Sequence, residues 1–170
     1  MTVRPFVMWP HKCLRSVAAP QDHINSQIRA IWDDMIDTMY AMPGVGLAAP
    51  QIGILKALAV VDCSEQRNAP VRLANPELVW ASDELAEQKE GSPNVPEQWA
   101  VVRRPKTVAV RYLDDTGAEV ERIFEGLWAD SAQHQIDHLC GKMFFDRLSS
   151  TKRRMILAKH EKMLRKRRRQ

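Results

Sequence analysis

The chain has 170 residues, of which 45% are apolar and 27% charged, and a formal net charge of +4. This length suits one domain with its own core, and no apolar run approaches the roughly 20 residues that cross a bilayer, so we expect no contact with a membrane. The three cysteines have no CxxC spacing, and the N-terminus lacks an apolar signal segment. These features argue against a disulfide framework or a four-thiolate zinc site, and they predict a cytoplasmic protein.

The N-terminal part of the chain predicts one amphipathic helix. Isoleucine and methionine recur at helical spacing over 22–42, with Asp22 as the expected N-cap and Pro43 as the stop. A loop of small residues follows over 44–53, and the apolar run over 55–62 is typical of a buried strand. A helix is therefore expected to precede the sheet region.

The middle of the chain has the pattern of antiparallel strands. This pattern continues over 71–125, and the Asp-Asp-Thr-Gly sequence at 114–117 predicts a hairpin turn. Helical spacing returns over 127–140, and Gly141 is placed to end that helix in a left-handed cap. A last helix is expected from about residue 151. Helices on both sides of a long antiparallel region predict an α+β fold.

The positive charge is concentrated at the C-terminal end. Residues 152–170 hold 10 of the 25 lysines and arginines but one of the 21 acidic residues, so this segment carries +9 and residues 1–151 carry −5. We therefore divide the chain into a domain over 1–151 and a basic helix and tail over 152–170. Such a segment suits salt-sensitive binding to a polyanion such as RNA, and a solvated tail without a partner is the alternative.

One pair of histidines has the spacing of metal ligands. His134 and His138 are four residues apart in a predicted helix, so both imidazoles project from one face toward a common cation. Taken alone, the pair has a plainer interpretation as two histidines that fall four apart by chance. Asp137 suits an ion pair or a packing contact at least as well as a ligand role.

Three separated segments change that interpretation when they are read together. The segments are GVGLAAPQ over 44–51, EGSPNVP over 90–96 and QHQIDHL over 133–139. They occur in the order, and at about the spacing, of the three motifs of peptide deformylase, and the resemblance extends over nearly the whole chain. It implies the α+β peptide-deformylase fold, with antiparallel sheets around a central helix that carries both histidines and a C-terminal helix on the outside.

The resemblance also assigns roles to residues. In that family a metal, usually iron, is held by the cysteine of an EGCLS motif and both histidines of an HExDH motif, and the reaction removes formate from N-terminal formyl-methionine. Ser92, His134 and His138 take the metal positions, which would hold iron or zinc. Gln51 takes the position that donates to the oxyanion, and Gln135 that of the catalytic glutamate. The substrate-binding positions fall on Val45, Gly46, Pro93 and Arg104.

The sequence departs from the family at three positions that carry chemistry. The neutral hydroxyl of Ser92 is a poor ligand where the family has a thiolate, so we expect any metal to bind weakly. Gln135 has no carboxylate, which removes a general base whose typical contribution is about 10²–10⁴-fold. Pro93 has no backbone N–H for the oxyanion, and the loss of one such donor costs about 10²–10³ in rate.

Other positions allow two interpretations. The helical turn that lines the methionine pocket in the family is the polar sequence Asp-Ser-Ala over 130–132 here, which weakens the case for formyl-methionine as the ligand. Gly44 and Gly46 suit tight packing under the sheet as well as substrate binding. Arg104 by itself suits a solvated surface position equally well.

We therefore expect a deformylase-like protein with little or no deformylation, which binds a peptide N-terminus, formyl-methionine or another, near the ribosome. The basic tail would contact the ribosome or its RNA. Three alternatives remain. The protein is a weak but genuine deformylase with Ser92, His134 and His138 around a metal, a hydrolase or acyltransferase that uses Ser92 as a nucleophile, or an RNA-binding protein on the same scaffold.

Overall fold

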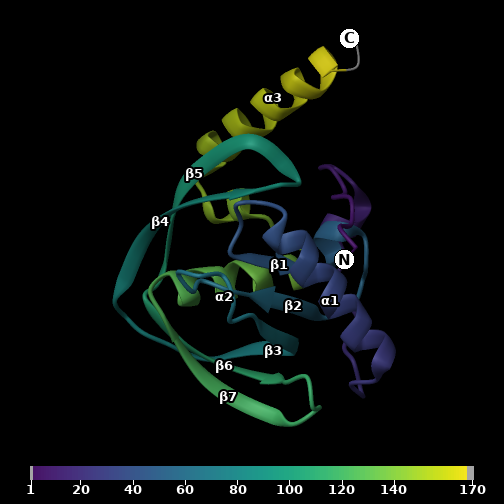
Figure 1. The fold of residues 1–170 in the computed structure, drawn as a ribbon. Helices are drawn as coiled ribbons and strands as arrows, with labels where there is room; N and C mark the ends of the chain where they lie inside the picture. Colours follow the sequence, from purple (N-terminus) through teal and green to yellow (C-terminus); the bar gives the residue numbers. More distant parts are fainter. Residues whose placement is uncertain (1, 168–170) are drawn as a thin grey trace.

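The computed structural model describes residues 2–167, and within this range two antiparallel sheets surround one central helix (Figure 1). The larger sheet has the order β1-β2-β3-β6-β7, and β4 pairs with β5 as a separate hairpin. The strands are β1 (Gly46–Ala48), β2 (Leu58–Val61), β3 (Val71–Ala81), β4 (Leu85–Ser92), β5 (Val95–Pro105), β6 (Thr107–Leu113) and β7 (Glu119–Glu125). The helices are α1 (Ser26–Tyr40), α2 (Leu127–Leu139) and α3 (Ser150–Arg167), with short 3-10 helices η1 (Lys12–Arg15), η2 (Ala49–Ile52) and η3 (Phe144–Arg147). The expected α+β fold is confirmed.

Helix α1 forms where the apolar spacing predicts it, but it begins later. Its N-cap is Asn25, whose side-chain oxygen accepts a hydrogen bond from the backbone N–H of Ile28 at 3.0 Å, so the prediction of Asp22 as the cap was wrong. Asn25 has extended backbone angles, as a cap requires, and its amide oxygen satisfies a donor of the first turn. The buried side chains of Trp32 and Met35 belong to the core cluster that also contains Leu47 and Leu58 of the large sheet.

Strand β3 continues through an Asn-Pro dipeptide, which would be expected to end a strand. Asn75 has a φ of 50° and the register with β6 shifts between Ala74 and Glu77, so the Asn-Pro dipeptide forms a bulge inside one strand. The Asn75 side chain accepts from the backbone N–H of Gln21 at 2.8 Å and donates to its carbonyl at 2.7 Å. The predicted hairpin around Gly117 is confirmed as the connection between β6 and β7.

Helix α2 ends as its sequence predicts. Gly141 follows with a φ of 70°, and the N–H of Lys142 donates to the carbonyl of Asp137 at 2.8 Å, which closes the last turn. The helix contacts β1, β2 and β7 of the large sheet as well as β5 of the hairpin. This central place explains why polar side chains on α2, His138 among them, are buried.

Helix α3 leads away from the hairpin and carries the basic residues (Figure 1). Ile156 and His160 are buried on its inner face, and His160 Nε2 lies 3.1 Å from the carbonyl oxygen of Trp9. Arg168 and Arg169 of the expected basic tail lie outside the described residues. No helix within 2–167 is long and apolar enough to cross a membrane.

Substitution of Gly141 by alanine should destabilise the protein. A left-handed backbone costs a residue other than glycine about 1–2 kcal/mol, and the new Cβ would lie 2.6 Å from the carbonyl oxygen of Arg15. Gly117→Ala is the matched control, because Gly117 has a φ of 88° but only ordinary contacts at 3.8 Å. Urea unfolding followed by tryptophan fluorescence should give a larger loss for Gly141→Ala; equal losses would contradict the tight approach at Arg15.

Candidate functional site

The three sequence motifs meet at one cleft with a volume of about 430 Å³. One wall is the loop that enters β1, the second is the β4–β5 hairpin, and the third is the cleft-facing side of α2. Its lining includes Val45, Gly46, Gln51, Ser92, Pro93, His134 and Gln135. Of the residues expected in the site, His138 and Arg104 lie behind this lining and are buried.

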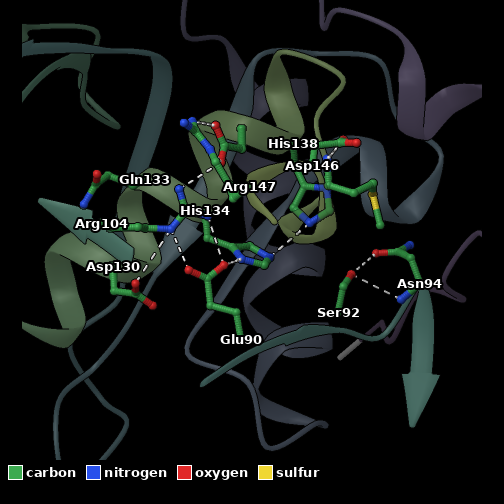
Figure 2. Close-up of polar contacts among 12 residues, drawn as sticks. Glu90, Ser92, Asn94, Arg104, Asp130, Gln133, His134, His138, Asp146 and Arg147 are labelled. Atoms are coloured by element: carbon green, nitrogen blue, oxygen red, sulfur yellow. Dashed lines mark hydrogen bonds and ion pairs between the residues drawn. The ribbon is translucent and has the colours of Figure 1, made fainter. Parts of the chain in front are cut away.

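The two histidines face each other across one turn of α2 (Figure 2). Their Nε2 atoms are 3.1 Å apart, which is close to the separation of about 3.3 Å expected for two nitrogens bound to one tetrahedral zinc. His134 Nδ1 lies 2.7 Å from a carboxylate oxygen of Glu90, which leaves Nε2 to face a ligand. Burial and the neighbouring His134 hold the pKa of His138 well below its ordinary value. His138 is therefore a neutral imidazole at neutral pH, with a lone pair that a cation can use.

Two of the three expected metal ligands, His134 and His138, have donor atoms that fit a metal ion. No group of three His, Cys, Asp or Glu side chains among residues 2–167 has an arrangement that could hold an ion. At the third position the Ser92 hydroxyl donates to the side-chain oxygen of Asn94 at 2.8 Å, so its oxygen remains a neutral, weak ligand. Two imidazoles without a thiolate or carboxylate suit an ion that binds weakly.

Asn94 is buried beside Ser92 and forms hydrogen bonds with two residues that line the cleft. Its Oδ1 accepts from Gln51 Nε2 at 2.9 Å as well as from Ser92. Its Nδ2 donates to the carbonyl oxygens of Val7 at 2.6 Å and Gln51 at 2.8 Å, and Gln51 Oε1 accepts from the N–H of Ala48 at 2.9 Å. The amide of Gln51 is thus already bonded within the protein. We gave Asn94 no role from the sequence, although it stands at the serine of the EGCLS motif and completes a run of three replacements.

Gln135 lies against the glycine loop. A Cβ at Gly46 would be 2.5 Å from Gln135 Nε2 and 2.5 Å from Ser131 Oγ. A larger residue at this position would therefore require the ends of both side chains to shift. Gln135 Oε1 is buried and has no hydrogen-bond partner among the described residues.

Arg104 does not lie where a substrate would meet it, which corrects its assignment as a substrate-binding residue. It is 3% exposed. Its Nε and Nη2 donate to the two carboxylate oxygens of Glu90 at 2.6 and 3.0 Å, and its Nη1 donates to Asp137 at 2.8 Å (Figure 2). Burial opposes ionisation of Glu90, but the hydrogen bonds from His134 and Arg104 lower its pKa to about 2 overall. Arg104 is a structural residue whose charge is matched inside the protein.

Asp130 lines the cleft one helical turn before His134 and is incompletely paired. Its Oδ1 is buried without a hydrogen bond, and it lies 3.7 Å from Arg104 Nε, which already donates to Glu90. Burial and the charge of Glu90 raise the pKa of Asp130 to about 6. This carboxylate is therefore ionised at neutral pH at a cost in stability.

The comparisons with known proteins agree with the geometry. The description "Polypeptide deformylase" belongs to the family profile that matches residues 3–154. The chain is 44% identical to a peptide deformylase of Methylocella silvestris over 95% of this chain and 85% of that protein. A solved peptide deformylase of Legionella pneumophila has a TM-score of 0.91 and 38% identity over 99% of both chains. One of Acinetobacter baumannii, solved with Met-Ala-Ser bound, has a TM-score of 0.81 and 32% identity over 86% of this chain and 99% of that one.

Asp130→Asn should stabilise the protein, and by more as the pH rises. Because the folded state raises the pKa of Asp130 from 3.8 to about 6, this group stabilises the fold below about pH 4, and that contribution is lost as the pH rises through 6. The unfolding free energy of the variant minus that of the original protein should thus grow between these pH values by up to about 2–3 kcal/mol. Urea unfolding across this range measures the difference.

Asp137→Asn is the control, since hydrogen bonds from Arg147 and Arg104 overcome the effect of burial and lower the pKa of Asp137. That variant should be less stable than the original protein at neutral pH, with a difference that shrinks as the pH falls. A pH-independent difference for Asp130→Asn would contradict the assigned charge state.

Proposed function

Because the chain belongs to the polypeptide deformylase family, we propose that its cleft binds the N-terminus of a formylated peptide and removes the formyl group slowly. The observation that carries the proposal is the meeting of Gln51, Ser92 and the histidine pair around one cleft, with three chemical groups exchanged. Relatives that are named peptide deformylases favour a genuine but weak hydrolase over a binding protein without catalysis.

Peptide binding is supported by the position of β1. This strand is at the edge of the large sheet, and Val45 and Gly46 at its start line the cleft. An extended peptide can pair its backbone with such an edge strand. The Acinetobacter baumannii relative was solved with the tripeptide Met-Ala-Ser, and we assign a peptide of this kind to the cleft.

His134 and His138 are the residues that would hold a metal ion, with Ser92 as a weak third ligand. When bound, such an ion polarises a carbonyl group and makes a water molecule more acidic. Glu90 holds His134 in the orientation that points Nε2 away from the hairpin carboxylate. The neutral state of His138 removes the need to lose a proton before an ion binds.

The chain's own groups explain why turnover is slow. Gln135 lines the cleft, but its amide cannot take a proton from a water molecule at neutral pH. Gln51 must release its hydrogen bond to Ser92 or to Asn94 before its amide can donate to a developing oxyanion. Pro93 offers no second donor. These groups act on one transition state, so their losses do not multiply independently.

The hypothesis of a serine nucleophile has less support. In the described part of the chain, the Ser92 hydroxyl has hydrogen bonds with Asn94 and Gln51, and neither amide is a base. A nucleophilic serine requires a general base within hydrogen-bond reach.

We also infer a second function, in which α3 binds RNA and thereby brings the protein to the ribosome. The separate role of the basic segment after residue 151 rests on its charge and on the way α3 extends away from the rest of the fold (Figure 1). Five basic side chains on α3 are exposed and have no ion pair among the described residues; they are Lys152, Arg154, Lys159, Lys162 and Lys166. Exposed cations of this kind displace counterions from phosphates, which makes the binding sensitive to salt.

Restoring the family residues should raise the activity. The triple variant Ser92→Cys, Pro93→Leu and Gln135→Glu regains a thiolate ligand, an oxyanion donor and a base, so formate release from N-formyl-Met-Ala-Ser should rise by at least about 100-fold. Gln135→Glu alone is the control and should gain much less. If the original protein already turns over several times per second, the proposal of a slow enzyme is wrong.

Replacing four of these residues, Arg154, Lys159, Lys162 and Lys166, with glutamine should greatly weaken co-sedimentation with ribosomes at low salt, because about four phosphate contacts are lost. The inner face with Ile156 and His160 stays intact, so the fold should survive. Four exposed cations of the domain, replaced in the same way, form a control of equal charge: Lys12, Arg103, Arg111 and Lys142. Loss of binding in both variants, or in neither, would show that α3 is not the contact.

A further inference from the structure

Apolar side chains line the cleft from two of its walls. Pro43 belongs to the loop before β1, and Pro96 and Trp99 belong to β5. Trp99 is the largest of the three and is 59% exposed. Single exposed apolar side chains are common on proteins, so exposure alone does not define a site. What distinguishes Trp99 is the way in which the hairpin holds its ring beside the cleft.

The indole of Trp99 lies against the backbone of Gly91, its cross-strand neighbour in the β4–β5 hairpin. A Cβ at Gly91 would be 2.5 Å from Cε3 of the ring and 2.7 Å from Cζ3, so the missing side chain leaves the space that the ring occupies. Lys89, two residues earlier in β4, places its Nζ 5.7 Å from the ring centroid, within the range of a cation–π interaction. Trp99 is therefore held in place on the hairpin although much of its surface is in water.

The ring lies close to the expected centre of the reaction. Gly91, which it covers, directly precedes Ser92, and both residues line the cleft. An extended peptide advances about 3.3 Å per residue. A peptide whose formyl group lies between Ser92 and His134 therefore brings its second or third residue within reach of the indole.

The exposed surface of an indole favours one class of partner. A second aromatic ring packs against it in an offset or edge-to-face arrangement, which adds to the gain from burying the apolar area of both rings. A short side chain such as that of alanine or serine covers little of the indole and leaves it in water. An aromatic side chain of the peptide therefore matches Trp99 best.

We propose that Trp99 is a specificity-determining residue, which binds an aromatic side chain at the second or third position of the peptide. The inference rests on the proposed function, because it assigns part of a peptide whose N-terminus lies in the cleft. It deepens that function by naming the class of side chain that is preferred after the formylated residue.

Calorimetric titration with three peptides tests the inference. N-formyl-Met-Phe-Ser and N-formyl-Met-Ala-Phe are compared with N-formyl-Met-Ala-Ser, which has no aromatic side chain. The original protein should bind at least one of the phenylalanine peptides at least about 5-fold more tightly than the reference peptide. Trp99→Ala should reduce this ratio to near one, whereas Trp99→Phe keeps an aromatic ring and should retain most of it. Trp80→Ala is the matched control and should keep the ratio, because Trp80 is 54% exposed on β3, outside the cleft lining.

The possible outcomes separate this inference from the function on which it rests. Equal binding of the three peptides by the original protein overturns the inference and leaves the proposed function standing. A phenylalanine preference that survives in Trp99→Ala, as it would if the ring only supported the hairpin, overturns it as well, and so does its loss in Trp80→Ala. If none of the three peptides binds, both the inference and the proposed function are wrong. Should Trp99→Ala fail to fold, Trp99→Leu takes its place, since leucine still covers Gly91 but has no ring.

Discussion

The cleft depends on the guanidinium of Arg104. This group lies on β5, holds Glu90 of β4 through two hydrogen bonds and reaches Asp137 on α2. It therefore fastens the small hairpin to the central helix in the buried interior, where removing one partner of an ion pair costs about 3–5 kcal/mol. Because the same carboxylate of Glu90 meets His134 at 2.7 Å, the ion pair that holds the fold also orients the histidine.

The ion pairs of Arg104 maintain the shape of the site without involving the groups that would act on a substrate. The hairpin, the glycine loop and α2 meet as in a deformylase, and Gly46 packs closely against the side chains of Gln135 and Ser131. The groups that would act on a substrate are different in kind. On our proposal, the amide of Gln135 takes the place of a base, the hydroxyl of Ser92 that of a thiolate, and Pro93 that of an N–H donor. None of these three residues is hydrogen-bonded to Arg104. On our proposal, a frame of this kind tolerates the exchange of catalytic groups because its stability comes from other residues.

The sequence predicted the parts of the fold that depend on local patterns. Helical spacing located α1 and α2, and Gly141 marked the end of α2 because few other residues adopt its backbone angles. Strand β4 was harder to predict, because its hairpin faces solvent on one side and carries charged residues. The prediction that Arg104 binds the substrate failed for a related reason. Whether its side chain points inward depends on its register opposite Ala86, and a single strand's sequence does not determine register. The hydrogen bonds of Asn94 depend on Val7, far away in the chain.

We infer that His134 and His138 remain from a metal centre without a strong third ligand. Two Nε2 atoms 3.1 Å apart can share an ion, but the hydroxyl of Ser92 is bonded to Asn94 and adds little affinity. The most direct test is elemental analysis of protein purified without oxygen, before and after dialysis, with the Ser92→Cys variant beside it. We expect the original protein to lose its iron or zinc on dialysis and the variant to retain more. One tightly held ion per original chain after dialysis would contradict this account.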